Sequence, residues 1–226
     1  MKRRQAVPMH SPAPVPPAYY PLFLNLSKKR AVVIGGGKVA ERKIFPLLRT
    51  GAHITVISPE ITKKIGSAKQ KKTIRHIARQ YRSGDLKDAF LVIAATDSPV
   101  VNEQVSRDAP CLVNVVDTPH LCNCIVPSTM IRGPLNIAVS TSGISPALSR
   151  SIRKELEKVY GCEFSQYLQS LRKIRQDAIE MIPDKRKRTE FLKCIASEKM
   201  IRKLRGKGLQ EMKKTAEALL KKAKAS

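Results

Sequence analysis

The stretch RAVVIGGGKVA, Arg30 to Ala40, decides the fold of this 226-residue chain. An apolar run typical of a buried strand leads into three glycines, and the helix-length segment VAERKIFPLLRTG follows. Gly35, Gly37 and Ala40 fit the pattern G-x-G-x-x-A. In a Rossmann turn the first glycine makes the bend, the second admits a pyrophosphate, and the small third residue lets helix and strand pack closely.

The start of the following helix adds a second reason to expect a nucleotide here. Unpaired backbone N–H groups near Lys38 and Val39 would face the phosphates. The alternative is a glycine-rich turn without a ligand, but strand, turn and helix together favour the nucleotide. Our candidate cofactor-binding residues at this turn are Gly35, Gly36, Gly37, Lys38 and Val39.

Five strand-like segments recur along the first half of the chain, with helix-length segments between most of them. Three are continuous apolar runs, as expected for strands that are buried on both faces of a parallel sheet. The pattern predicts an α/β fold with a Rossmann-like parallel sheet. The segments are residues 31–35, 53–58, 73–78, 90–96 and 111–116.

The pattern changes after Asp117. Two short strand candidates, CIVPSTMI and LNIAVST, flank the turn residues RGP and predict a hairpin. A helix should follow from Ser145 as N-cap and Pro146 as first residue to a C-cap at Gly161. The rest reads as helices, with breaks at Pro183, Gly206 and Gly208. We expect a tail (1–18), a Rossmann domain (19–122), a hairpin-plus-helix segment (123–161) and a C-terminal helical domain (162–226).

The strand ends supply the other candidate site residues. A dinucleotide site usually has an acidic residue at the end of its second strand, but here that strand ends in Ser58, Pro59 and Glu60. Glu60 could bind the ribose hydroxyls or sit in the first turn of the next helix. The motif therefore does not decide between NAD and NADP. Ser58, Pro59 and Glu60 are all cofactor-binding candidates.

The fourth and fifth strands should bring polar residues to the same carboxyl edge of the sheet. Thr96 and Asp97 follow the fourth strand and are cofactor-binding candidates, although Asp97 could instead cap the next helix. Asn114 and Asp117 belong to the fifth strand and its end. A carboxylate beside a nicotinamide could act as a general base, whereas its structural alternative is a turn ahead of Pro119.

Composition limits the class of partner. There are 43 Lys and Arg residues against 18 Asp and Glu, a net charge of +25 that is spread over both halves. This surplus predicts an anionic partner without choosing its kind. The five cysteines lack a disulfide-framework spacing and favour a reducing cytoplasm. No membrane-spanning run is present, and the proline-rich stretch QAVPMHSPAPVPPA indicates a flexible tail rather than a signal peptide.

His120, Cys122 and Cys124 form an H-x-C-x-C cluster of residue types that can bind zinc or iron. No second pair with matching spacing accompanies them. The two cysteines could equally pack on one side of a strand. We predict no metal site in the protein.

Three long motifs resemble the precorrin-2 dehydrogenases of siroheme synthesis. They are YYPLFLNLSKKRAVVIGGGKVAERK, VIAATDSPVVN and NVVDTPHLCNCIVPSTMIRGPLNIAVSTSGISPALSRSIR, and they cover roughly residues 19–160. The resemblance implies NAD-dependent oxidation of precorrin-2 to sirohydrochlorin, with Asp117 as the catalytic residue. Some members also insert ferrous iron to give siroheme.

The resemblance further implies a homodimer formed through the hairpin and the following helix, with C-terminal helices completing a cleft. The family's serine-rich loop is retained as Ser142, Gly143, Ser145 and Pro146, and with Asn114 its two serines are candidates for substrate binding. Cys124 departs from the family, which often has an aromatic residue there. Some relatives continue into a methyltransferase domain, which we do not expect in these 226 residues.

The positive charge agrees with this resemblance because precorrin-2 carries many carboxylates. Two alternatives stay open. A nucleotide-sensing Rossmann regulator could bind nucleic acid or protein, but no DNA- or RNA-binding motif is visible and only 4% of residues are aromatic. A dehydrogenase of the same fold could act on another anionic substrate. We expect neither a nucleic acid nor a membrane partner.

Overall fold

The computed structural model describes residues 18–225 of the chain, and these residues form two compact units. The first unit runs to Val126 and includes Ser142–Ile144, and the second comprises Pro127–Thr141 and the residues from Ser145 onward. Apart from Ala18, the predicted tail over residues 1–18 lies outside the described residues. Each unit has its own hydrophobic core, so each is described by itself.

The first unit is built on a five-stranded parallel sheet with the order β3-β2-β1-β4-β5. The predicted strands and the Rossmann-like fold are therefore confirmed. The central strand β1 pairs with β2 on one side and with β4 on the other, and Val33 lies opposite both Val56 and Ile93. The strands are β1 (Arg30–Ile34), β2 (His53–Ile57), β3 (Ile74–Ile77), β4 (Leu91–Ala94) and β5 (Leu112–Val115).

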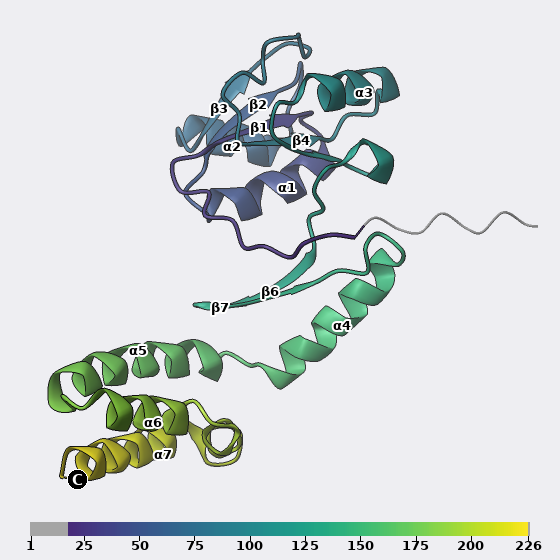
Figure 1. Ribbon diagram of the computed structural model, residues 1–226. Coiled ribbons are helices and arrows are strands. Elements are labelled where there is room, and N and C mark those ends of the chain that lie inside the picture. The colour runs from purple at the N-terminus through teal and green to yellow at the C-terminus, as the bar shows by residue number, and fades with distance from the viewer. Residues whose placement is uncertain (1–17, 226) are drawn as a thin grey trace, which may run out of the picture. The chain divides into compact units, whose positions relative to one another are not determined.

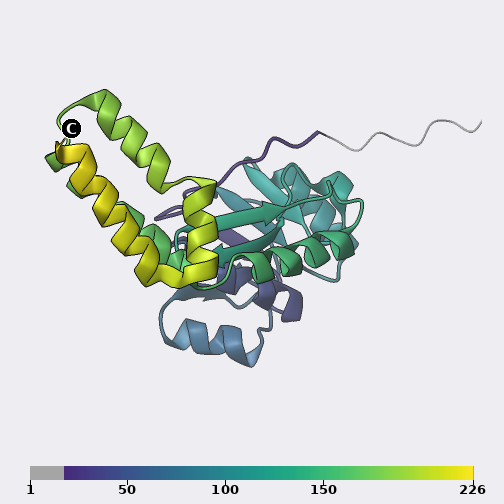
Figure 2. The same ribbon diagram turned by 90° about the horizontal axis from the view of Figure 1, so that it is seen from below.

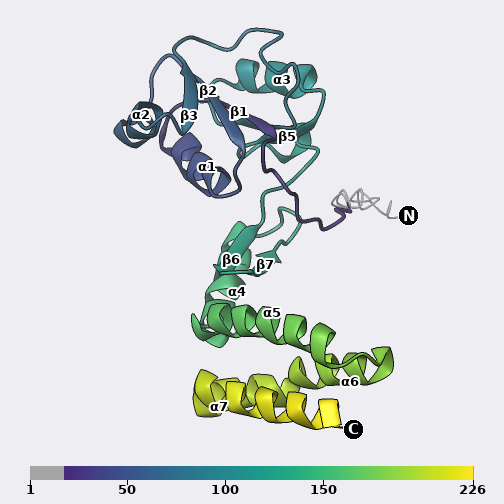
Figure 3. The ribbon, with the colours of Figure 1, turned by 90° about the vertical axis from the view of Figure 1, so that its left-hand side faces the viewer.

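Helices cover both faces of this sheet, which explains its continuous apolar strands (Figures 1 and 3). Helices α1 (Lys38–Leu48) and α2 (Lys63–Gln70) pack on one face, where alternate strand residues such as Val33 join Ile44 in one core. Helix α3 (Pro99–Asp108) packs on the other face, where the intervening strand residues such as Val32 join Val105.

The second unit begins with the predicted hairpin, formed by β6 (Ser128–Arg132) and β7 (Leu135–Val139). Helix α4 (Pro146–Val159) follows as the sequence predicts. The Ser145 hydroxyl accepts a hydrogen bond from the Leu148 N–H at 3.2 Å and caps the helix. The helix ends one residue early, with Tyr160 rather than Gly161 as its C-cap.

Three further helices complete the second unit: α5 (Glu163–Met181), α6 (Lys185–Ile195) and α7 (Glu198–Ala225). The predicted breaks at Pro183 and Gly208 are present, whereas the predicted break at Gly206 is wrong because Gly206 is helical. Gly208 has φ +80 and interrupts α7, which turns sharply there (Figure 2). The Lys203 ammonium contacts the Thr215 hydroxyl, so the two halves of α7 fold back on each other.

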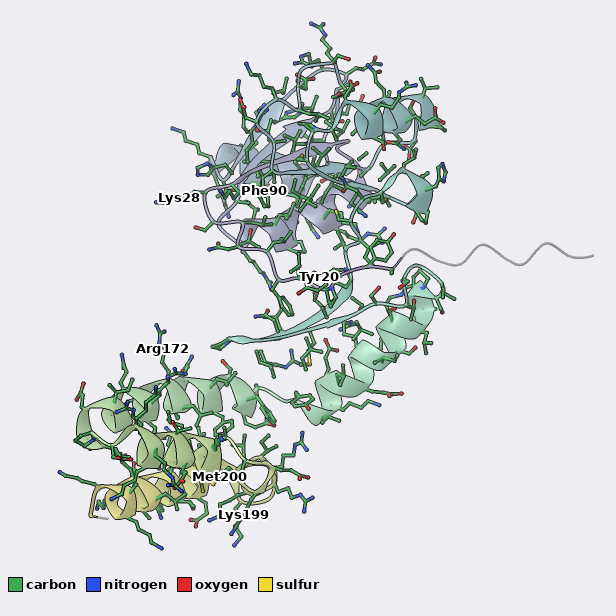
Figure 4. All side chains as sticks on the ribbon, in the orientation of Figure 1. Tyr20, Lys28, Phe90, Arg172, Lys199 and Met200 are labelled. Carbon is green, nitrogen blue, oxygen red and sulfur yellow. The ribbon has the colours of Figure 1, made fainter. Side chains whose placement is uncertain are left out.

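The core of the helical unit is apolar, and its charges are on the surface. Met200 is 3% exposed within this core, whereas its neighbour Lys199 is exposed (Figure 4). The buried Tyr167 hydroxyl donates to the Ile195 carbonyl at 2.6 Å and ties α5 to α6. Among the helices of residues 18–225, none is both long enough and apolar enough to span a membrane.

Candidate functional site

The glycine turn between β1 and α1 has the shape that the G-x-G-x-x-A pattern predicts. Gly35 has φ +111, and a Cβ there would lie 2.3 Å from the Ala95 carbonyl oxygen. A Cβ on Gly36 would lie 2.0 Å from the Glu60 carbonyl oxygen. Neither position can hold a side chain without moving backbone, so these two glycines let the loops after β2 and β4 pack against the turn.

Gly37 differs from its two neighbours because a Cβ built on it would meet no protein atom within 4 Å. It is the N-cap residue of α1 and lines a cavity of about 680 Å³. Its bare backbone therefore faces open space at the start of a helix, where unpaired N–H groups favour an anion. This arrangement fits a pyrophosphate group.

All the predicted cofactor-binding residues line this cavity, at the carboxyl edge of the parallel sheet. Ligands of open α/β sheets bind at this edge. Ile61, Thr62, Gln80, Tyr81 and Ser98 also contribute to the wall. The lining candidates are Gly35, Gly36, Gly37, Lys38, Val39, Ser58, Pro59, Glu60, Thr96 and Asp97.

A buried carboxylate, Glu41, fixes the loop between β2 and α2 to the glycine turn. It accepts a hydrogen bond from the Thr62 hydroxyl at 2.6 Å, and the Thr62 N–H donates to the Gly36 carbonyl at 3.0 Å. The Lys64 ammonium lies 3.3 Å from the same carboxylate. The hydrogen bond from Thr62 is the main cause that lowers the pKa of Glu41. The sequence analysis missed Glu41, whose only signal is an acidic residue in a first helical turn.

The structure decides between the alternative roles that the sequence leaves open for two acidic candidates, Glu60 and Asp97. Helix α2 is capped by Thr62, so Glu60 lies in the preceding loop and not in the first helical turn. Helix α3 is capped by Ser98, so Asp97 is not the capping residue. Both carboxylates belong to exposed residues at the cavity wall. Thr96 is held by hydrogen bonds with Asn102.

The loop after β3 contributes Gln80 and Tyr81 to the lining of the cavity. The Tyr81 hydroxyl donates to the Asp108 carboxylate at 2.7 Å, and the Ser83 hydroxyl donates to it at 2.9 Å. Desolvation is the main cause that raises the pKa of Tyr81, and the bond to Asp108 adds to it. The sequence analysis did not identify this loop, because these contacts join residues about two dozen positions apart.

Asp117 follows β5 at the other end of the carboxyl edge. Its backbone has φ +59, in the left-handed region that aspartate tolerates better than most residues. The side chain is exposed, and the short 3₁₀ helix Pro119–Leu121 follows it. Asp117 therefore combines the predicted turn with a carboxylate at the edge, although it is not among the residues that line the 680 Å³ cavity.

Lys43 on α1 is a second residue near this end that the sequence analysis missed. It is half-buried, and burial is the main cause that lowers the pKa of its ammonium group. The charges of Asp117 and Cys122 act in the opposite direction. A lysine thus shares the electrostatic environment of the candidate carboxylate.

Asn114 and the nearby cysteines hold the chain after β5 in place. The buried Asn114 amide donates to the Cys124 carbonyl at 3.1 Å, and the Val115 N–H donates to the Cys122 sulfur at 3.1 Å. Desolvation raises the pKa of the Cys124 thiol to about 11. Within residues 18–225 no three His, Cys, Asp or Glu side chains gather as metal ligands would. His120 is exposed on the 3₁₀ helix.

The two serine candidates lie in the turn between β7 and α4. Ser142 has φ +52 and precedes Gly143, whose φ is +84. Ser145 is the N-cap residue of α4, so its hydroxyl is engaged with the helix. Neither serine is among the residues that line the cavity in the Rossmann unit.

Comparison with known proteins identifies the class of this site. An NAD(P)-binding family model matches residues 22–128, which include the whole parallel sheet and the glycine turn. A second family model, described as sirohaem biosynthesis protein central, matches residues 132–158. The first unit is thus a nicotinamide-nucleotide-binding Rossmann unit, and the segment from the hairpin turn through β7 and most of α4 is similar to the central part of sirohaem biosynthesis proteins.

Relatives and a solved structure place the chain more narrowly. It is 44% identical over 140 residues to a siroheme synthase from Methylobacillus flagellatus and 38% identical over 176 residues to one from Azotobacter vinelandii. These matches cover 61% and 76% of this chain. The solved structure of SirC, a precorrin-2 dehydrogenase, superposes with a TM-score of 0.76 at 29% identity and covers 88% of this chain and all of that one.

The siroheme synthase relatives and the precorrin-2 dehydrogenase structure confirm the resemblance that the three sequence motifs indicate. The chain spans about a third of the siroheme synthases that it matches, 30% of the Methylobacillus protein and 38% of the Azotobacter protein. These findings do not favour the alternative of a nucleic-acid-binding regulator.

Proposed function

We propose that this protein is a dehydrogenase that oxidises precorrin-2 to sirohydrochlorin with NAD as electron acceptor, a step of siroheme biosynthesis. The observation that carries the proposal is the cavity over the bare backbone of Gly37, in a chain that resembles SirC over the whole of that structure. The name of SirC and the names of the siroheme synthase relatives support the substrate.

The sheet order supports a direction for the dinucleotide. In Rossmann folds the adenosine ribose binds beside the end of the second strand. Here β2 and β3 lie on one side of β1, and β4 and β5 lie on the other. With the pyrophosphate over Gly35–Gly37, the adenosine end lies toward Ser58 and Glu60. The nicotinamide end then lies toward Asp97 and Asp117.

Asp117 is the proposed proton acceptor. Oxidation of a carbon–carbon or carbon–nitrogen unit to its unsaturated form removes one hydride and one proton, and NAD supplies the hydride acceptor. The Asp117 carboxylate takes the proton on the exposed edge of the sheet. The half-buried Lys43 contributes positive charge near this carboxylate.

We propose NAD rather than NADP because the adenosine end of the cavity is acidic. Glu60 can accept hydrogen bonds from ribose hydroxyls, whereas a 2′-phosphate beside it would place like charges together. Lys38 is the basic member among the described cavity-lining residues, and it lies at the glycine turn, 3.9 Å from Glu41. No cation of the lining is thus directed to a 2′-phosphate.

Positive charge in the second unit suits the polycarboxylate substrate. Arg150, Lys154 and Lys158 are exposed on α4, while Arg153 is paired with Glu157. Exposed cations of this kind attract an anion from solution and then pair with its carboxylates. We propose that these exposed cations of the helical unit attract the acidic side chains of precorrin-2. Asn114, Ser142 and Ser145 stay our candidates for substrate binding.

We also propose a homodimer formed through the hairpin and α4. Of the α4 residues, all of which the structure describes, Ser149 alone is buried. Three apolar residues of this segment are each about half exposed: Leu148 and Val159 on α4, and Ile131 in the hairpin. An amphipathic helix beside a two-stranded sheet can bury such exposed apolar side chains against a second copy of the chain. A dimer mass in light scattering supports this proposal, and a monomer at micromolar concentration contradicts it.

Insertion of ferrous iron into sirohydrochlorin is a second candidate activity, which the siroheme synthase names of the relatives favour. Iron is a substrate of this step. Metal insertion requires a base that removes pyrrole protons, and Asp117 is the proposed base for this reaction as well.

The decisive experiment is anaerobic incubation of the protein with precorrin-2 and NAD, monitored by the absorbance of NADH and sirohydrochlorin. We expect both products in equal amounts, and siroheme after ferrous iron is added. No NADH, with precorrin-2 unchanged, would contradict the dehydrogenase. Turnover of a different anionic substrate would favour a related dehydrogenase, and salt-sensitive binding of duplex DNA without turnover would favour a regulator.

A further inference from the structure

The segment Ser58–Thr62, which joins β2 to α2, forms one wall of the cavity, and all five of its residues line it. Hydrogen bonds hold this wall at both ends. At its start, the His76 ring on β3 donates through Nε2 to the Ser58 carbonyl at 2.9 Å. At its end, the Thr62 N–H donates to the Gly36 carbonyl at 3.0 Å. The wall is therefore fixed to the sheet on one side and to the glycine turn on the other.

Glu41 on α1 holds the second end of this wall through the Thr62 side chain. The Glu41 side chain is 9% exposed, and its Oε2 accepts a hydrogen bond from the Thr62 hydroxyl at 2.6 Å. The same hydroxyl accepts from the Ile65 N–H at 3.3 Å and caps α2. A short bond to an ionised carboxylate is stronger than one between neutral groups. One hydroxyl thus joins α1, the wall and α2.

The charge of Glu41 opposes the anion that the glycine turn is suited to bind. Glu41 lies in the first turn of α1, where the helix N-terminus favours an anionic group. A carboxylate in this turn repels a pyrophosphate nearby. Two exposed lysines lie beside it, with the Lys64 Nζ 3.3 Å from Oε1 and the Lys38 Nζ 3.9 Å from Oε2. These cations offset the charge, while the carboxylate oxygen keeps its bond to Thr62.

We propose that Glu41 is a positioning residue for the dinucleotide: the oxygen of its side chain, and not its charge, holds Thr62 and with it the wall Ser58–Thr62 in the geometry that binds the adenosine end. Lys64 offsets the charge that the pyrophosphate would otherwise meet. The proposal rests on the proposed dinucleotide site and on the direction proposed for the dinucleotide. Glu41 is not among the residues that line the cavity, so it acts through Thr62.

The test compares two substitutions of Glu41 in the full chain by calorimetric titration with NAD and with ADP. Glu41→Gln keeps an oxygen that accepts the bond from the Thr62 hydroxyl but removes the charge, whereas Glu41→Ala removes both. ADP contains the adenosine and the two phosphates that NAD and NADP share, so its binding does not depend on which dinucleotide is the cofactor. We expect Glu41→Ala to weaken the binding of both ligands by about tenfold or more, and Glu41→Gln to restore binding at least as tight as that of the wild type.

A third substitution tests the route through Thr62. Thr62→Val removes the hydroxyl and should weaken ADP binding about as much as Glu41→Ala does. The double variant should bind little more weakly than either single variant, because both substitutions remove the same hydrogen bond. If Glu41→Ala gives no folded protein, Thr62→Val provides the same test.

A fourth substitution tests the role of Lys64. Lys64→Met should weaken ADP binding by about threefold in the wild-type chain, because the charge of Glu41 is then less well offset. In the Glu41→Gln chain the same substitution should have no effect. An equal loss in both chains would show that Lys64 acts on the nucleotide directly and would overturn its proposed role.

A matched control in the helical unit separates positioning from a general loss of stability. Asp184 caps α6, where its Oδ1 accepts from the Lys187 N–H at 2.7 Å. Asp184→Ala removes a helix cap, as Thr62→Val does, and should lower the melting temperature. It should change the dissociation constant of neither ligand.

Three results would overturn the role of Glu41 alone. One is a folded Glu41→Ala variant that binds ADP and NAD as the wild type does, and another is the same result for Thr62→Val. The third is a Glu41→Gln variant that binds as weakly as Glu41→Ala, which would assign the effect to the charge. A wild-type protein that binds neither ADP nor NAD would overturn the nucleotide site together with this proposal, so the two failures are distinguishable.

Discussion

The Rossmann unit and the helical unit use polar groups in opposite ways. In the Rossmann unit, side-chain pairs tie loops and helices together around the sheet: Glu41 holds Thr62, Asp85 holds Arg79, and Asp108 holds Tyr81. In the helical unit the core side chains are apolar apart from the buried Tyr167 hydroxyl, and ion pairs such as Arg202–Glu198 are exposed. The difference teaches that precise polar geometry is concentrated in the Rossmann unit, whereas the helical unit contributes packing and surface charge.

The largest expected effect is on turnover and concerns Asp117. Asp117→Asn keeps a residue that tolerates φ +59 but removes the proton acceptor. We expect NADH production to fall by about a hundredfold or more, as for removal of a general base. Because the side chain is exposed, the melting temperature and the NAD affinity should stay near wild type. Near-normal NADH production by this variant would remove Asp117 from the mechanism.

A pair of glycine substitutions, one in each unit, tests this contrast between the units most directly. Gly35→Ala forces a Cβ to within 2.3 Å of the Ala95 carbonyl oxygen at φ +111, whereas Gly206→Ala in α7 places its Cβ in open space. We expect Gly35→Ala to lower the free energy of unfolding by about 2–3 kcal/mol and to abolish NAD binding. Gly206→Ala should be neutral or stabilising by up to about 1 kcal/mol. Denaturant titration and calorimetry measure both effects, and equal losses would contradict the contrast.

A smaller effect is expected when the helical unit loses the buried hydrogen bond that joins α5 to α6. Tyr167→Phe removes the hydroxyl that donates to the Ile195 carbonyl at 2.6 Å. The loss should cost about 1 kcal/mol of unfolding free energy, because the carbonyl is left without that donor. Hydrogen exchange should increase in α5 and α6, while the NAD dissociation constant should not change. A weaker NAD affinity would show that the units are less independent than their separate cores indicate.

The smallest effect should come from acid, and it should be located in the Rossmann unit. The hydrogen bond from Arg79 is the main cause that lowers the pKa of Asp85, and the bond from Tyr81 does the same for Asp108. Since folding lowers these pKa values, the contribution of each group is present above its unfolded pKa of about 4 and is lost as the pH falls further. We expect only a small loss of stability, seen as lower amide protection factors near residues 79–85 below about pH 4.

Much of the fold could be predicted because local patterns and tertiary structure agree. Strand-like segments in the sequence marked all five strands of the sheet, and Ser145 with Pro146 marked the start of α4. The residues around the glycine turn followed from spacing alone, and all of them line the cavity. Their role in binding a cofactor remains a prediction.

The missed residues share a physical reason. Glu41 meets Thr62, and Tyr81 meets Asp108, only after separate strands pair and helices cover the sheet. In the sequence each is an ordinary polar residue that would usually face water. Arg79 and Asp85 are closer in sequence, but nothing in the local pattern distinguishes a locked arginine from a solvated one.

The bond from the Thr62 N–H to the Gly36 carbonyl, and that from the Gly35 N–H to the Ile57 carbonyl at 2.9 Å, have a kinetic consequence. They build the glycine turn during folding, so a nucleotide meets a rigid receptor and need not wait for a rare open state. Capture should then follow a single bimolecular phase whose rate grows linearly with nucleotide concentration. Loss of either hydrogen bond would lower the association rate constant of the nucleotide before it raised the dissociation rate constant.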